Sequence, residues 1–252
     1  MARKIFIATI TLPVVPAVRD GYLQAALGSF RKARACGVMD HPLPYLGDAL
    51  RDFFIGLEQS NLLAFSALGE EDGKVIFKRV YGLNQSGDYF TLDHGENLKS
   101  FWELVAALDA AHDVLVGHGL LGHDLPLVYR MSVVHRQRPT AELRSGGAGA
   151  GLVFDTEKEW DRSASGMEPL PSVAQALGLD DTLLDPLDDR TMYELFFMGW
   201  HVELVRRCVA AVKAVREIYY RLTFEAPPEM PAPWRWKGVE DLTPSAGYGK
   251  DS

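Results

Sequence analysis

Residues 4–12, KIFIATITL, form a nearly continuous run of apolar and β-branched side chains close to the start of the chain. A strand with one solvated face alternates polar and apolar residues, whereas an unbroken run suits a strand that is buried on both faces. The run follows two basic residues, as the core of a signal peptide would, but Thr9, Thr11 and Pro13 interrupt it. A buried first strand is therefore the better interpretation.

The later segments predict a hairpin and then helices that alternate with strands. Two strand-like runs, residues 61–68 and 74–82, flank an acidic turn that ends in Gly73, which is the pattern of a β-hairpin. Apolar spacing predicts helices within 20–55 and at 96–111, 125–137, 170–178, 190–199 and 201–222, and short strands at 89–92, 113–119 and 152–156. This order predicts an α/β domain over residues 1–224, with a mixed central sheet and flanking helices.

Composition limits the classes of function. The chain has 252 residues, of which 47% are hydrophobic, and it contains no apolar run of transmembrane length, so we expect no membrane segment. Two cysteines, Cys36 and Cys208, are too few for a disulfide framework and predict reduced thiols in a cytoplasmic protein. The net charge of −8 disfavours tight, sequence-independent binding of nucleic acid. The sequence has no GxGxxG, P-loop, HExxH, CxxC or GxSxG motif.

Residues 225–252 form a tail that is rich in proline and small polar residues and cannot build a packed core alone. Trp234 and Trp236 flank Arg235 in this tail. The two rings could anchor a protein partner or stack on a base. Packing against the chain's own domain is the simpler expectation.

Three segments follow one another in a fixed order. The first strand ends in IATITLP (7–13), GHGLLGHD (117–124) connects a strand to a helix, and the last helix contains RRCVAA (206–211). LPSVAQALG (170–178) and MYELFFMG (192–199) precede the third segment. Together they resemble the DnaQ-like (DEDD) 3′–5′ exonucleases, above all the predicted exonucleases related to the exonuclease domain of DNA polymerase B. The resemblance covers most of the chain before the tail and implies an RNase H-like fold.

The same resemblance implies a site of four carboxylates that hold two Mg²⁺ or Mn²⁺ ions for phosphodiester hydrolysis. Of these, only Asp124 is present, and Ala8, Ile10 and Ala211 stand at the other three positions. One carboxylate cannot hold two such ions. We therefore expect a degenerate exonuclease, or pseudoenzyme, that needs no cofactor and binds nucleic acid, a nucleotide or a protein partner.

Two alternatives remain open. An active Mg²⁺- or Mn²⁺-dependent exonuclease could have a rebuilt metal site around Asp124, His118 and His123, with Asp155 close by. A pure protein-interaction subunit, with the tail as its contact, would need no such site. Asp124 also precedes the helix predicted at 125–137, where a carboxylate commonly caps the N-terminus, and capping is the simpler role for Asp124 and for Asp155 at the end of its strand.

Basic side chains near the motifs are candidates for binding phosphate. Arg130 lies on the helix after the second motif, and His123 lies within that motif. Arg207 stands where the family has a tyrosine, and could bind a phosphate or pair with Asp124. The acidic residues that follow Asp155, beginning with Glu157, predict a solvated segment.

Overall fold

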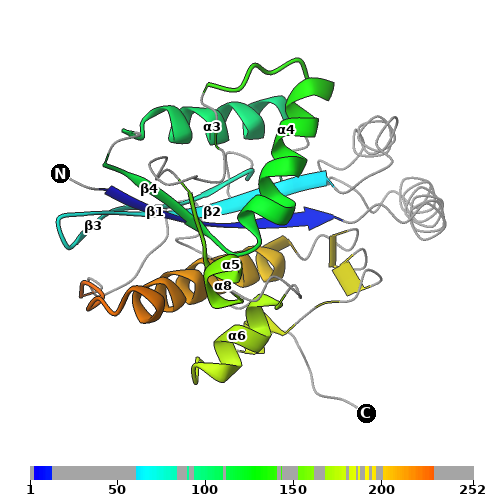
Figure 1. The fold of residues 1–252 in the computed structure, drawn as a ribbon. Helices are drawn as coiled ribbons and strands as arrows, with labels where there is room; N and C mark the ends of the chain where they lie inside the picture. Colours follow the sequence, from blue (N-terminus) through cyan, green and yellow to red (C-terminus); the bar gives the residue numbers. More distant parts are fainter. Residues whose placement is uncertain are drawn as a thin grey trace, which may run out of the picture.

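The computed structural model has a five-stranded sheet with helices over both faces (Figure 1). The strand order is β3-β2-β1-β4-β5, which places the first strand in the middle of the sheet. The structure describes residues 3–12, 61–83, 90, 94–109, 112–140, 143, 153–161, 168–179, 182–185, 187, 191–192, 195–196 and 201–229.

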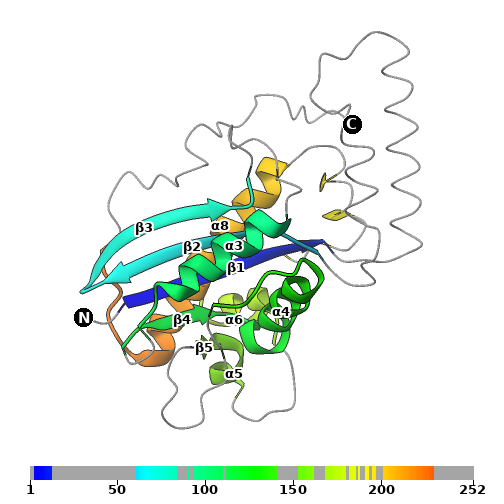
Figure 2. The ribbon, with the colours of Figure 1, turned by 90° about the horizontal axis from the view of Figure 1, so that it is seen from above.

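The central strand β1, Arg3–Leu12, confirms the first sequence prediction. It pairs antiparallel with β2, Asn61–Glu71, and parallel with β4, Val114–Gly117, as Figure 2 shows from above. β2 continues into β3, Lys74–Tyr81, through a tight turn, so the predicted hairpin is also confirmed. β5, Val153–Asp155, adds a third parallel strand beside β4. The sheet is therefore mixed, as expected.

Alternate side chains of β1 enter two separate cores, which explains why its sequence is apolar throughout. Phe6 packs with the last helix, α8 (His201–Thr223), on one face. Ile7 packs with α3 (His94–Ala106) and α4 (Leu125–Val134) on the other. Figure 1 shows α3 and α4 on one side of the sheet and α8 on the opposite side, together with α5 and α6. The central strand is thus covered on both faces.

Helix boundaries differ from the predictions by a few residues. The helix predicted at 96–111 ends at Ala106, and the helix predicted at 125–137 ends at Val134. A π-helical turn, η2 (Leu120–Asp124), precedes α4 and was not predicted. Short helices α5 (Thr156–Trp160) and α6 (Leu170–Ala176) follow β5, and a 3₁₀ turn η3 covers Thr182–Leu184.

Several predictions fall outside the described residues. These are the helices within 20–55, the state of Cys36, and the tail beyond residue 229 with Trp234 and Trp236. Of the strand predicted at 89–92, Phe90 is described and forms a single bridge to Leu83. Across the described part of the chain, no helix is both long and apolar enough to cross a membrane.

Candidate functional site

Ionisable side chains gather where the parallel strands β4 and β5 end. The carboxyl ends of parallel strands meet at one edge of a sheet, where loops commonly form ligand sites. β4 leads into η2 and β5 leads directly into α5, so both connections lie at this edge. We call the polar residues of these two connections the strand-end cluster: His118, His123, Asp124, Asp155 and Glu157.

The β1 positions that the resemblance assigns to carboxylates face α8 and not solvent. Ala8 and Ile10 are each 7% exposed and belong to the same core as Cys208. The Cys208 thiol donates to the Ala8 carbonyl oxygen at 3.3 Å, and burial raises its pKa to about 12. Ala211 packs partly buried against this core. Strand and helix therefore meet in an apolar contact, and the thiol is neutral and chemically quiet at physiological pH.

Asp124 does not cap α4, so that prediction is wrong. Its backbone is already helical (φ −68°, ψ −49°) because η2 runs directly into α4, and its side chain makes no capping hydrogen bond. Instead, its Oδ1 lies 3.0 Å from Nδ1 of His123. Asp124 is buried, whereas the His123 side chain is 57% exposed. The hydrogen bond to Asp124 raises the pKa of His123, and the negative charge of Asp124 adds to that rise.

His118 is held by structural contacts. Its Nε2 donates to the carbonyl oxygen of Glu168 at 2.7 Å, and its Nδ1 lies 3.0 Å from the hydroxyl oxygen of Thr156. A metal ligand needs a free ring lone pair, which a donating nitrogen lacks. Across the described residues, no three His, Cys, Asp or Glu side chains are grouped to hold a metal ion. The structure thus does not assemble His118, His123 and Asp124 into the ligand set of the rebuilt-site alternative.

Asp155 caps α5, as predicted, and also fixes the loop after β4. Its Oδ1 accepts from the backbone N–H of Glu157 at 3.1 Å and of Gly119 at 2.9 Å, and its Oδ2 accepts from Leu121 N–H at 2.8 Å. Gly119 has φ +69°, a left-handed backbone conformation that residues with a side chain rarely adopt. Asp155 therefore ties β5 to the start of η2 and sets the position of His123 and Asp124.

Glu157 is the residue of this site that the sequence analysis placed wrongly. It was expected in a solvated segment, yet it is only 9% exposed. Its Oε2 points towards Gly119, lying 3.6 Å from the position that a Cβ there would occupy. Burial raises the pKa of Glu157, and the charges of Asp155 and Asp124 also raise it, against an opposing effect of His118. No described residue donates a hydrogen bond to its carboxylate, whose oxygens keep contact with solvent.

The two cations nearest the motifs have different environments. Arg130 is exposed on α4, two helical turns after His123, and its positive charge lowers the pKa of His123, which places the two side chains on one side of the helix. Arg207 instead binds Glu203 Oε1 at 3.2 Å and the carbonyl oxygens of Leu183 and Asp185. Of the two roles considered for Arg207, pairing with Asp124 is not what the structure has, because Glu203 and the η3 region supply its partners.

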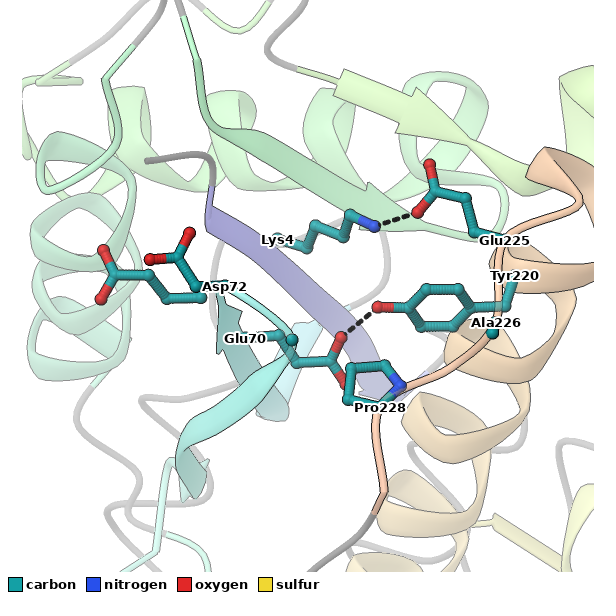
Figure 3. Close-up of a pocket in the computed structure, with 9 residues that line it drawn as sticks. Lys4, Glu70, Asp72, Tyr220, Glu225, Ala226 and Pro228 are labelled. Atoms are coloured by element: carbon teal, nitrogen blue, oxygen red, sulfur yellow. Dashed lines mark hydrogen bonds and ion pairs between the residues drawn. The ribbon is translucent and has the colours of Figure 1, made fainter.

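A second polar region lies at the opposite end of β1. Here Arg216 Nε lies 2.5 Å from Glu70 Oε1, both side chains are 2% exposed, and the Tyr220 hydroxyl donates to the same carboxylate. We call Glu70, Arg216 and Tyr220 the α8 junction. A cavity of about 250 Å³ adjoins this junction, and Lys4 and Glu225, which pair with each other, both line it (Figure 3).

The chain after α8 is fixed at this junction. Arg216 Nη2 donates to the Pro228 carbonyl oxygen at 2.7 Å, and Lys4 lies over the Tyr220 ring at 4.7 Å from its centroid. Burial, and then the hydrogen bond to Glu70, raise the pKa of Tyr220, so its hydroxyl stays protonated and remains a donor. The first residues of the tail thus pack against the domain, and the charged groups of this region satisfy one another.

No protein-family model matches the sequence, and no curated protein matches it.

Proposed function

We propose that this chain is an RNase H-like domain of the DnaQ-like exonuclease type that has lost its two-metal centre and binds a phosphate-bearing ligand, a nucleotide or a nucleic-acid end. The mixed sheet with helices on both faces is compatible with that fold. The ordered motifs at residues 7–13, 117–124 and 206–211 support the family part of the proposal.

The apolar contact between β1 and α8 is the observation that supports the loss of nuclease chemistry. Two-metal hydrolysis needs several oxygen ligands that converge on one point. Ala8 and Ile10 provide a buried apolar surface there, and the Ala8 carbonyl oxygen is already used by the Cys208 thiol. Of the four carboxylate positions that the resemblance implies, Asp124 alone keeps its carboxylate, and that group is bonded to His123.

His123 and Arg130 support the binding half of the proposal. Both are exposed, both offer N–H donors, and the Asp124 carboxylate favours the protonated imidazole. Two adjacent cations can hold one phosphate group through charge-assisted hydrogen bonds. A net charge of −8 opposes binding along an extended backbone. The proposed ligand is therefore a short molecule or a chain end rather than a long duplex.

Binding should be measured by fluorescence anisotropy with short 5′-labelled DNA and RNA oligonucleotides, and by calorimetry with nucleoside monophosphates. We expect salt-dependent binding that weakens in His123→Ala and Arg130→Ala. Arg221→Ala is the matched control, because it removes an exposed arginine from the far end of α8. Metal-dependent shortening of the oligonucleotide that disappears in Asp124→Ala would overturn the proposal.

A protein-interaction subunit is the second candidate. Val133 and Val134 at the end of α4 are adjacent and are 79% and 55% exposed. Neighbouring exposed apolar side chains are typical of contact surfaces. Salt-dependent binding of phosphate ligands that needs Arg130 would count against this candidate, whereas its absence would favour it.

A further inference from the structure

β3 is an edge strand, and several of its side chains are open to solvent. It is the outermost strand on the side of the sheet away from β5, and within the described part of the chain β2 is the one strand that pairs with it (Figure 2). Ile76 is 47% exposed, and Lys74 and Arg79 are also exposed. The outer side of an edge strand presents backbone N–H and C=O groups with which another extended chain can pair. β3 is therefore a candidate docking surface, remote from the strand-end cluster that follows β4 and β5.

β3 is basic although the chain as a whole is acidic. Lys74, Lys78 and Arg79 are three of its eight residues, and the strand has no aspartate or glutamate, whereas the chain has a net charge of −8. Lysine on an edge strand commonly prevents identical strands from pairing, because like charges would then face each other. The same charges attract an acidic strand. An acidic chain is therefore a more favourable occupant of this edge than a second copy of β3.

One of these cations stands on the face of the sheet that α8 covers. Lys78 is paired in register with Leu68, whose side chain packs against α8, so Lys78 lies on that face. β2 contacts α8 at two points that bracket Leu68, namely Ser66 with Cys208 and Glu70 with Arg216. Lys213 is exposed on α8 between those points and thus stands near Lys78. Burial and the charge of Lys213 both lower the pKa of Lys78, in agreement with this placement.

Arg79 stands on the other face of the strand, because adjacent residues of a strand point to opposite faces. Its guanidinium carbon lies over the Tyr81 ring, 4.7 Å from the ring centroid, on the face that α3 covers. A strand added beside β3 would therefore meet Lys78 on one face and Arg79 on the other. Two consecutive acidic residues suit that arrangement, since their carboxylates also point to opposite faces.

The hydrogen-bonding groups of the edge distinguish a peptide from a nucleic acid. A phosphate backbone would match the positive charge, but phosphate oxygens only accept hydrogen bonds. The edge of a strand offers carbonyl oxygens as well as N–H groups, and the carbonyl oxygens need donors. An extended peptide supplies donors and acceptors at the spacing of the edge. An acidic peptide therefore matches both the charge and the backbone groups of β3.

We propose that β3 is a docking edge for an extended segment of a partner protein with two consecutive acidic residues, which adds to the sheet as a further strand. Backbone hydrogen bonds hold the segment, and Lys78 and Arg79 contact its two carboxylates. This surface goes beyond the proposed phosphate site and shares no residue with it. Either proposal can therefore fail without the other.

Fluorescence anisotropy of the full chain with the labelled peptide Thr-Val-Thr-Glu-Glu-Val-Thr-Val tests the charge requirement. We expect salt-dependent binding that weakens about fivefold in Lys78→Glu and in Arg79→Glu, because each change replaces an attraction with a repulsion. Lys158→Glu is the matched control, because it reverses an exposed cation on α5, next to the opposite edge of the sheet. Circular dichroism checks that each variant is folded. Absence of binding to the wild type would overturn the proposal.

Backbone methylation of the peptide distinguishes strand addition from charge attraction alone. A docked strand directs the N–H groups of alternate residues towards its neighbour. Of two peptides N-methylated at odd and at even positions, one should therefore bind at least about tenfold more weakly than the other, because it loses several hydrogen bonds. Equal binding of both would overturn the docking edge.

Hydrogen exchange locates the bound peptide. We expect it to protect the backbone amides of residues 74–81 in the wild type, without any change at the strand-end cluster. Protection that appears elsewhere and leaves 74–81 unchanged would contradict the proposal. Protection of 74–81 by an oligonucleotide, or by raised protein concentration alone, would instead assign the edge to a nucleic acid or to a second copy of this chain.

Discussion

The two polar regions at opposite ends of the sheet differ in the hydrogen-bond partners that they give to a carboxylate. At the α8 junction, Glu70 is 2% exposed and is satisfied by Arg216 and Tyr220. In the strand-end cluster, Glu157 is 9% exposed, no described residue donates to its carboxylate, and its oxygens keep contact with solvent. Burial of a charged group alone therefore does not mark a functional site. The fold itself supplies the partners of Glu70, whereas solvent can supply those of Glu157, so the two carboxylates should respond differently to substitution.

The largest expected effect comes from breaking the α8 junction. Arg216→Ala leaves Glu70 buried beside Tyr220 alone, and removal of one partner of a buried ion pair costs about 3–5 kcal/mol. Urea unfolding should show that loss, while Arg221→Ala on the exposed face of the same helix should stay within about 0.5 kcal/mol of the wild type. The double variant Arg216→Met/Glu70→Leu should recover most of the stability. A loss in Arg216→Ala below about 1 kcal/mol would contradict a structural role.

The next effect is the pH dependence of phosphate binding in the strand-end cluster. The pKa of His123 is raised, so the imidazolium persists to higher pH than in a free histidine, and affinity should fall about fivefold as pH rises through that pKa. Asp124→Asn removes the main cause of the rise and should move this fall to lower pH. Arg130→Ala should weaken binding at every pH and move the fall slightly higher, because Arg130 lowers the pKa of His123. Affinity that is flat from pH 5 to 9 would exclude His123 as a ligand for phosphate.

Glu157→Gln should change the free energy of unfolding less than Arg216→Ala does, and in the opposite direction. Because burial raises the pKa of Glu157 above the ordinary value of 4.5, the folded state disfavours the ionised form, and stability is lost as pH rises through the folded pKa. Glu157→Gln should therefore stabilise the protein by about 0.5–1 kcal/mol at pH 7. The gain should vanish at about pH 4, where both states hold the proton. A destabilised Glu157→Gln at pH 7 would indicate that the carboxylate has an internal partner.

The smallest effect concerns the ion pair between Lys4 and Glu225, which both line the cavity in Figure 3. The Lys4 and Glu225 side chains are 22% and 49% exposed, and pairs of this kind contribute about 0–1 kcal/mol. Glu225→Gln should thus lower the free energy of unfolding by less than about 1 kcal/mol, and salt should reduce the difference. A loss as large as that of Arg216→Ala would mean that the tail contact, rather than the buried pair, holds the junction together.

Local patterns in the sequence were sufficient for much of the fold. The apolar run of β1 and the cap at Asp155 depend on neighbours within a few residues, and both predictions are confirmed. The capping role of Asp124 was wrong because Asp155, some thirty residues later, accepts from the loop N–H groups, and η2 continues into α4 without a cap. Distant contacts of this kind have no local signal in the sequence.

The same limit applies to the site. Glu157 has the appearance of a solvated acidic segment in the sequence, and only the packing of α5 against the β4 connection buries it. Its position two residues after the capping Asp155 was the one available clue. Arg207 was assigned to the motif site, but its partners come from η3.

We propose above all that this domain binds phosphate ligands without cutting them. A 5′-labelled single-stranded oligonucleotide is incubated with the protein and Mn²⁺. Fluorescence anisotropy then measures binding, and a denaturing gel measures the length of the oligonucleotide, so that binding and cleavage are tested together. The account predicts a rise in anisotropy that requires Arg130, while the oligonucleotide keeps its full length. Progressive shortening from the 3′ end that is lost in Asp124→Ala would contradict it.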